Sequence, residues 1–126
     1  MDDTKAVGEK LVKFCRSGLN LDAIGSLYSP DIVSVEAMGS AEMPAEMRGI
    51  EKIRGKNEWW LKNNEVHSSS ADGPFPNQDR FAVIFDYDTT AKDGQMKGKR
   101  MKFHEVGLYT VKDGKIVREE FYYDMG

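Results

Sequence analysis

The sequence is poor in residues that cross-link or bind metals: among 126 residues it holds one cysteine and two histidines. A lone Cys15 cannot form an internal disulfide, which indicates a reducing cytoplasmic setting and a small buried apolar role for this residue. The segment from Met1 to Lys13 mixes acids, bases and a glycine and is unlike a secretion signal, and no run approaches membrane-spanning length. We expect no metal and no cofactor.

The chain also lacks a strong charge of either sign, because 18 Lys and Arg stand against 21 Asp and Glu for a formal charge of -3. No broad basic field is present to attract phosphate backbones, so we expect no nucleic-acid partner and no membrane partner. Phosphate-binding glycine loops and Gly-x-Ser-x-Gly nucleophile turns are missing as well. With 40% hydrophobic and 31% charged residues, the sequence is typical of one globular domain, which we place at residues 1–126.

Apolar residues recur at helical spacing in three places in the first half of the chain. The spacing predicts a helix over residues 4–18, then a short one that carries Leu21, Ile24 and Leu27, and a third from Ile50 to Asn63. Gly18 ends the first helix. Between the second and third, residues 39–49 are rich in turn formers and predict a loop that crosses the domain and can act as a lid.

Strand-like segments fill the rest of the chain. Asp113-Gly114 lies between the last two and is a strong hairpin signal. Helices followed by hairpins favour an α+β fold, in which a curved, mostly antiparallel sheet of about five strands forms a cone with the three helices on its concave side. The expected core residues are Phe14, Leu27, Ile53 and Trp60, and the expected strands cover residues 31–38, 66–72, 80–91, 98–112 and 116–125.

Several segments resemble one known superfamily, in the same order and at similar spacing. Leu-Tyr-Ser-Pro-Asp at 27–31 resembles the entry to its first strand, residues 49–53 its third helix, and 109–117 with 121–124 its final hairpin. The chain is thereby identified as similar to the SnoaL-like and ketosteroid isomerase-like members of the nuclear-transport-factor-like superfamily, whose cone encloses a ligand cavity. The resemblance implies no single activity, because this fold carries isomerases, cyclases, dehydratases, hydrolases and non-catalytic binding subunits.

The resemblance carries over to individual residues only in part. The general-base carboxylate of ketosteroid isomerase falls on Glu36. Its oxyanion tyrosine falls on or beside Val12, and its partner carboxylic acid falls on Gly107, so neither donor is retained. Since a dienolate needs donors where its charge develops, steroid isomerisation by that mechanism is not expected.

Glu36 is nevertheless the leading candidate for a base. It alternates with Ser34 and Ile32 on one face of the first predicted strand, and a carboxylate inside an apolar cone suits proton abstraction. Lys56 lies on the side of the third helix that should look into the cavity. Two interpretations stay open for it: Lys56 pairs with Glu36 and holds it ionised, or it extends to solvent from the margin of the helix.

Two later strands supply further candidates. Glu105 and Tyr109 share the expected pocket face of one strand, and Tyr123 lies on the inward face of the last, where it can donate a hydrogen bond. Aromatic residues at strand spacing are often simply core, but in a cone the core is also the wall of the pocket. The expected ligand-binding residues are Lys56, Trp59, Trp60, Phe81, Phe85, Phe103, Glu119, Phe121 and Tyr123.

Two functional hypotheses follow. In the first, a cofactor-independent enzyme acts on a small apolar carbonyl compound: Glu36 removes a proton, and Tyr109, Tyr123 or Glu105 stabilises the enolate. In the second, the same fold only binds a small molecule, or is a dimerisation module. A homodimer is expected through the outer sheet face, whose predicted residues are Asp86, Asp88, His104, Val106, Leu108 and Thr110.

Overall fold

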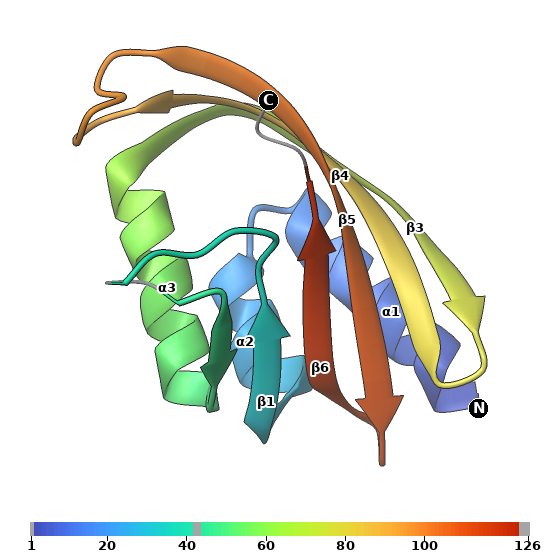
Figure 1. Cartoon of the computed structure of the whole chain (residues 1–126). Helices are drawn as coiled ribbons and strands as arrows, with labels where there is room; N and C mark the ends of the chain where they lie inside the picture. Colours follow the sequence, from blue (N-terminus) through green and yellow to red (C-terminus); the bar gives the residue numbers. More distant parts are fainter. Residues whose placement is uncertain (1, 42–43, 124–126) are drawn as a thin grey trace.

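Three helices lie on the concave side of one curved sheet in the computed structural model, which describes residues 2–41 and 44–123 (Figure 1). They are α1 (Asp2–Arg16), α2 (Asn20–Leu27) and α3 (Ile50–Asn63). Gly18 separates the first two with a φ of +72°, a conformation that glycine adopts without strain. The backbone then passes directly from α2 into the first strand.

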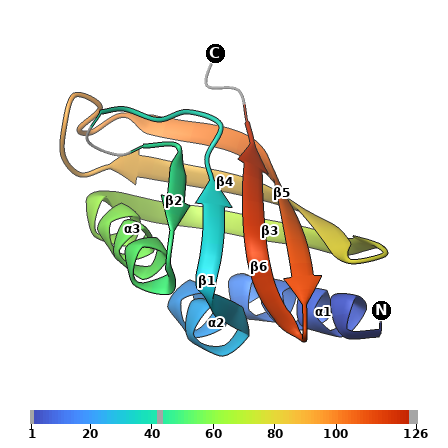
Figure 2. The same ribbon diagram turned by 60° about the horizontal axis from the view of Figure 1, so that its bottom comes forward.

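Six strands form one open sheet in the order β2-β1-β6-β5-β4-β3. The long strands β3, β4 and β5 arch over the helices in Figure 1, and Figure 2 shows β2, β1, β6 and β5 side by side. Neighbouring strands pair antiparallel except β1 and β6, which are parallel. Their bounds are β1 (Tyr28–Val35), β2 (Glu46–Arg48), β3 (Asn64–Asn77), β4 (Arg80–Ala91), β5 (Arg100–Lys112) and β6 (Lys115–Tyr122).

The predicted α+β cone is confirmed, with two corrections. The sheet is mixed, because the final hairpin returns β6 alongside β1 in the same direction. The segment predicted as a loop over residues 39–49 contains the short strand β2, which pairs with β1. Positions 42–43 of that segment, and the end of the last predicted strand beyond residue 123, lie outside the described residues.

The core lies between the helices and the concave face of the sheet. Leu27 and Ile53 are buried there, as predicted. Phe14 is only partly buried against this core, and Trp60 lines a cavity instead of filling the interior. The correction for Trp60 has a clear cause: the cone is not filled by side chains at its wide end, so Trp60 keeps part of its surface free there.

The convex face of the sheet carries exposed apolar and charged residues. Ile84, Val106 and Tyr122 lie in adjacent register on β4, β5 and β6 and are 39%, 37% and 53% exposed. His104 contacts Asp86 there, as expected for that face. Asp88 is buried and accepts two hydrogen bonds of 2.9 Å from Arg100.

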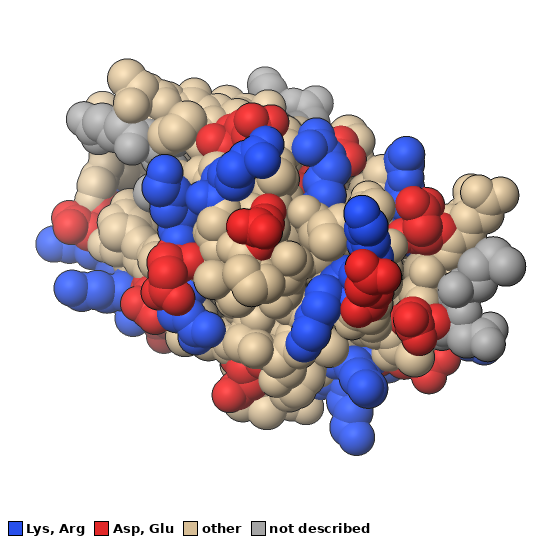
Figure 3. Space-filling model, turned by 90° about the horizontal axis from the view of Figure 1, so that it is seen from below, with Lys and Arg blue, Asp and Glu red and all other residues tan. Residues whose placement is uncertain are grey.

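Charges of both signs are interspersed over the molecular face seen in Figure 3. None of the helices among the described residues is long and apolar enough to span a membrane.

Candidate functional site

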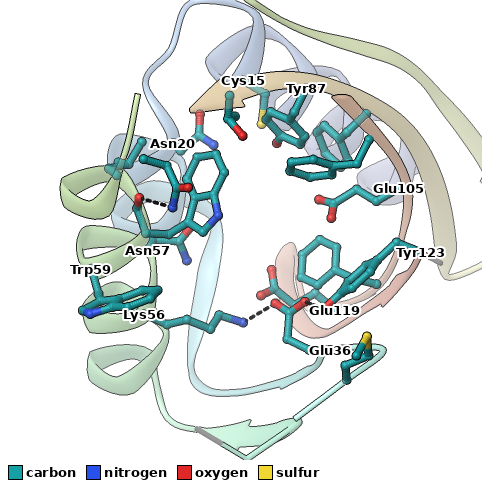
Figure 4. Close-up of a pocket in the computed structure, with 18 of the residues that line it drawn as sticks. Cys15, Asn20, Glu36, Lys56, Asn57, Trp59, Tyr87, Glu105, Glu119 and Tyr123 are labelled. Atoms are coloured by element: carbon teal, nitrogen blue, oxygen red, sulfur yellow. Dashed lines mark hydrogen bonds and ion pairs between the residues drawn. The ribbon is translucent and has the colours of Figure 1, made fainter. Parts of the chain in front are cut away.

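A cavity of about 740 Å³ lies between α3 and the concave face of the sheet (Figure 4). Its wall draws on α1, α2 and α3, on β1 with the segment that follows it, and on the later strands. Most of the wall is apolar, but three glutamates and one lysine meet in its interior: Glu36, Glu105, Glu119 and Lys56. Charged groups inside an apolar cavity interact strongly, because little water screens them.

Glu36 and Lys56 form an ion pair inside this cavity. The ammonium Nζ of Lys56 lies 2.8 Å from Oε1 of Glu36, and both side chains are mostly buried. The Tyr123 hydroxyl donates to the other carboxylate oxygen, Oε2, over 3.1 Å. Burial and the neighbouring Glu36 charge raise the pKa of Tyr123 to about 12, so this hydroxyl stays a donor at neutral pH. The interpretation in which Lys56 extends to solvent is therefore wrong.

A second carboxylate, Glu119, lies beneath this pair and is 1% exposed. Ser34 donates to its Oε2 over 2.6 Å, and the Tyr28 hydroxyl donates to its Oε1. Lys56 donates to Ser34 over 2.9 Å, so a continuous hydrogen-bonded chain runs from Glu36 through Lys56 and Ser34 to Glu119. Burial raises the pKa of Glu119, against the opposing effect of Lys56 and of its two hydroxyl donors.

Glu105 differs from the other two glutamates because it makes no hydrogen bond or ion pair with any described residue. Figure 4 shows its carboxyl group pointing into the cavity from β5. Burial, reinforced by the charges of Glu36 and Glu119, raises its pKa from 4.5 to about 7. At neutral pH this carboxyl group is thus present in both protonation states, which suits a general acid or base.

Aromatic rings form the wall around Glu105. Tyr87 contacts Trp60 edge-on at 5.7 Å between ring centroids and Phe103 at 5.2 Å. Phe85 is the cross-strand partner of Glu105. Burial raises the pKa of Tyr87 well above its usual value, so its hydroxyl remains protonated. The wall around Glu105 is therefore largely aromatic.

Most of the predicted site residues line the cavity. Phe81 does not, and Trp59 lies at the rim. Phe81 lies outside the cavity wall, because it is 1% exposed and stacks on the far side of Tyr109 at 4.9 Å. Trp59 reaches only the rim and is 52% exposed, since it follows Glu58 on the outer side of α3. The predicted residues on the cavity wall are Glu36, Lys56, Trp60, Phe85, Phe103, Glu105, Tyr109, Glu119, Phe121 and Tyr123.

Sequence reasoning missed Tyr28 and Tyr87 as site residues. The signal for Tyr87 was available, since it alternates with Phe85 on β4. No sequence signal was available for Tyr28, because its hydrogen bond to Glu119 joins residues 91 positions apart and depends on the parallel pairing of β1 with β6.

Cys15 also lines the cavity. Burial raises the pKa of its thiol to about 12, so the reactive thiolate is scarce at neutral pH. Within residues 2–41 and 44–123, no three His, Cys, Asp or Glu side chains are grouped as metal ligands.

A curved sheet with three helices on its concave side is the fold of solved structures described as cystatin-like and nuclear-transport-factor-like. The SnoaL-like domain model matches residues 3–123, and the chain belongs to that family. A solved structure described as a SnoaL-like polyketide cyclase from Mesorhizobium loti is 41% identical, with a TM-score of 0.86 over 94% of this chain and 97% of that one. No curated protein matches the sequence.

More distant structures share the fold alone. A nuclear-transport-factor-like protein from Burkholderia pseudomallei is 13% identical, with a TM-score of 0.76 over 98% of this chain and 92% of that one. A protein with a ketosteroid isomerase-like fold from Catenulispora acidiphila is 20% identical, with a TM-score of 0.71 over 97% of this chain and 88% of that one.

Proposed function

We propose that this protein is a cofactor-independent enzyme that moves a proton on a small, apolar, carbonyl-bearing molecule, as an isomerase, cyclase or dehydratase does. The observation that carries the proposal is the unequal state of two carboxyl groups in one cavity. Glu36 forms an ion pair with Lys56, whereas Glu105 has no such partner among the described residues and burial raises its pKa to about 7. Two carboxyl groups in unlike surroundings within one cavity are the usual arrangement of an acid and a base.

In this mechanism, the Glu36 carboxylate takes a proton from the carbon next to the carbonyl group. The C–H electron pair moves into the enolate, and protonated Glu105 donates a hydrogen bond to the carbonyl oxygen as its negative charge grows. Protonated Glu36 then returns the proton to another carbon of the substrate, so the enzyme ends in its starting state. Lys56 holds the Glu36 carboxylate in place through their 2.8 Å ion pair.

The charges also select the ligand class. Among the described residues, three glutamates face Lys56 inside the cavity, while Lys99 lies on its exposed rim. An anionic ligand would meet net repulsion from this set, whereas a neutral carbonyl compound would not. The match to a structure described as a polyketide cyclase supports the same class, since polyketides are carbonyl compounds.

The test begins with a native mass spectrometry screen of small cyclic ketones. Any ligand found is then incubated in D₂O, and exchange of the hydrogens next to its carbonyl group is followed by NMR. We expect Glu36→Gln to lower the exchange rate by about 10²- to 10⁴-fold while binding persists. Glu58→Gln, on the exposed side of α3, is the matched control and should exchange as the wild type does.

A second candidate is a small-molecule-binding protein without turnover. The observation that favours it is that each oxygen of Glu36 already accepts a hydrogen bond, one from Lys56 and one from Tyr123. Each oxygen has a second lone pair, so abstraction stays possible, but the carboxylate is a weaker base than an unpaired one. Binding of a ketone without exchange above the rate in buffer would favour this candidate.

In either case we propose a cytoplasmic location, since the single Cys15 forms no disulfide.

A further inference from the structure

The Tyr109 hydroxyl occupies the space that a side chain at position 107 would fill. A Cβ built on Gly107 would lie 3.0 Å from Oη of Tyr109 and 2.8 Å from its ring atom Cε2. The ring of Tyr109 therefore leans back along β5 over Gly107, in the direction of Glu105. Since successive residues of a strand are about 3.3 Å apart, this brings the hydroxyl roughly half of the distance from position 109 to position 105.

The Tyr109 ring is held in this position from two sides. Phe81 stacks on it at 4.9 Å with an interplanar angle of 12°, and Phe121 meets it edge-on at 6.1 Å. The whole residue is 2% exposed. A hydroxyl on so confined a ring has a fixed position, which is what a preorganised hydrogen-bond donor requires.

This hydroxyl is nonetheless free to bind a ligand. Tyr109 makes no hydrogen bond with any described residue, yet no fully buried side-chain polar atom among those residues lacks a partner. The oxygen must therefore contact the cavity, whose wall includes Tyr109. Burial raises its pKa well above the usual value, so it stays protonated. Glu105, two positions before Gly107 on the same face, is another cavity group without a hydrogen-bond partner among the described residues.

We propose that Tyr109 and Glu105 together form a two-donor site for one ligand oxygen, and that Gly107 is the residue that allows both donors to reach it. The inference deepens the proposed function and rests on it for the chemical identity of the ligand, which is a carbonyl group that becomes an enolate. The donor site itself can be measured without turnover, because a phenol carries a similar oxygen on a flat apolar ring.

The probe is para-nitrophenol, whose absorbance reports its ionisation, and nitrobenzene is the matched ligand without the hydroxyl group. Wild-type protein should bind para-nitrophenol more tightly than nitrobenzene. Tyr109→Phe keeps the ring and removes the donor, so para-nitrophenol should bind about tenfold or more weakly while nitrobenzene is unaffected. Gly107→Ala keeps the hydroxyl but forces the ring to move, and should weaken para-nitrophenol binding in the same way. Tyr122→Phe, at the exposed end of β6, is the control.

Equal affinity of wild-type protein and Tyr109→Phe for para-nitrophenol would overturn the proposal, as would equal affinity of the wild type for the two probes. Should Gly107→Ala not fold, the Tyr109→Phe comparison alone decides the question. The two levels of inference separate cleanly. Tyr109→Phe can lose para-nitrophenol binding while the wild type shows no ketone exchange. This result would support the donor site and contradict the proposed enzymatic activity. If the rate of ketone exchange is the same in Tyr109→Phe and in the wild type, the enzymatic activity is supported and the donor site is contradicted.

Discussion

Glu105 should make the folded protein less stable as the pH rises through neutrality. Its pKa is raised from 4.5 to about 7 in the folded state, mainly by burial, so folding favours the protonated form. A carboxyl group whose pKa is raised by folding lowers the free energy of unfolding when it ionises. This loss is absent at a pH below the pKa of the unfolded state and is complete at a pH above the pKa of the folded state. The affected window therefore runs from about pH 4.5 to pH 7 and above.

The magnitude follows from the same two values. Ionising a carboxyl group whose pKa has risen from 4.5 to about 7 lowers the free energy of unfolding by about 3 kcal/mol, at about 1.4 kcal/mol for each tenfold change in proton affinity. Glu105→Gln removes the ionisable group but keeps its shape. We expect the variant to gain stability relative to the wild type as the pH rises, by about 2.5 kcal/mol between pH 5 and pH 8.5.

Urea unfolding followed by circular dichroism at several pH values measures this difference. Only the comparison with the wild type is used, because other groups titrate in both proteins. Glu58→Gln, which alters an exposed carboxyl group on α3, should show a flat difference over the same range. A difference for Glu105→Gln that stays constant with pH would show that Glu105 titrates normally, and its assignment as an acid near neutrality would fail.

Lys56→Met should destabilise the protein by about 1–3 kcal/mol at pH 7, because Glu36 loses its cation and Ser34 loses a donor. Thermal unfolding measures the loss, and the double change Lys56→Met with Glu36→Gln should be less destabilised than Lys56→Met alone; an equal loss in the two variants would contradict the ion-pair role. We also propose that the convex sheet face forms a homodimer, since Val106 lies in an exposed apolar row between Ile84 and Tyr122. Sedimentation at micromolar concentration should give a dimer for the wild type and a monomer for Val106→Lys, and a monomeric wild type would refute it.

The fold could be predicted from local signals because each of its long elements carries its own pattern. The helix Ile50–Asn63 and the strand Arg80–Ala91 have the predicted bounds, and Asp113-Gly114 turns the last hairpin as expected. What the local pattern lacks is pairing between distant segments. The strand β2 is three residues long, and it is a strand only because Glu46–Arg48 pairs with β1. Nothing within such a short segment distinguishes it from loop.

The site could be predicted to the level of which residues face inward. Alternation along β5 and β6 placed Glu105, Tyr109, Glu119 and Tyr123 on the concave face, and all four line the cavity. Alternation could not separate a wall residue from a core residue, which is why Phe81 was included among the ligand-binding residues. The difference between Phe81 and Phe85 is their depth along β4: Phe81 lies where α1 already covers the sheet, against Gly8.

The pairing of the carboxyl groups is the part of the site that no local pattern contains. Glu36 and Glu105 are the same residue type on inward strand faces, and among the described residues Lys56 is the cation inside the cavity. That cation reaches Glu36 because α3 places Lys56 beside the end of β1, where Ser34 also accepts from it. Glu105 lies farther along the curve of the sheet among Phe85, Tyr87 and Phe103, so burial acts on it without a compensating partner. Glu36 is therefore paired and Glu105 is not because the sheet curves around one helix. That curvature is a property of the assembled cone and not of any single segment.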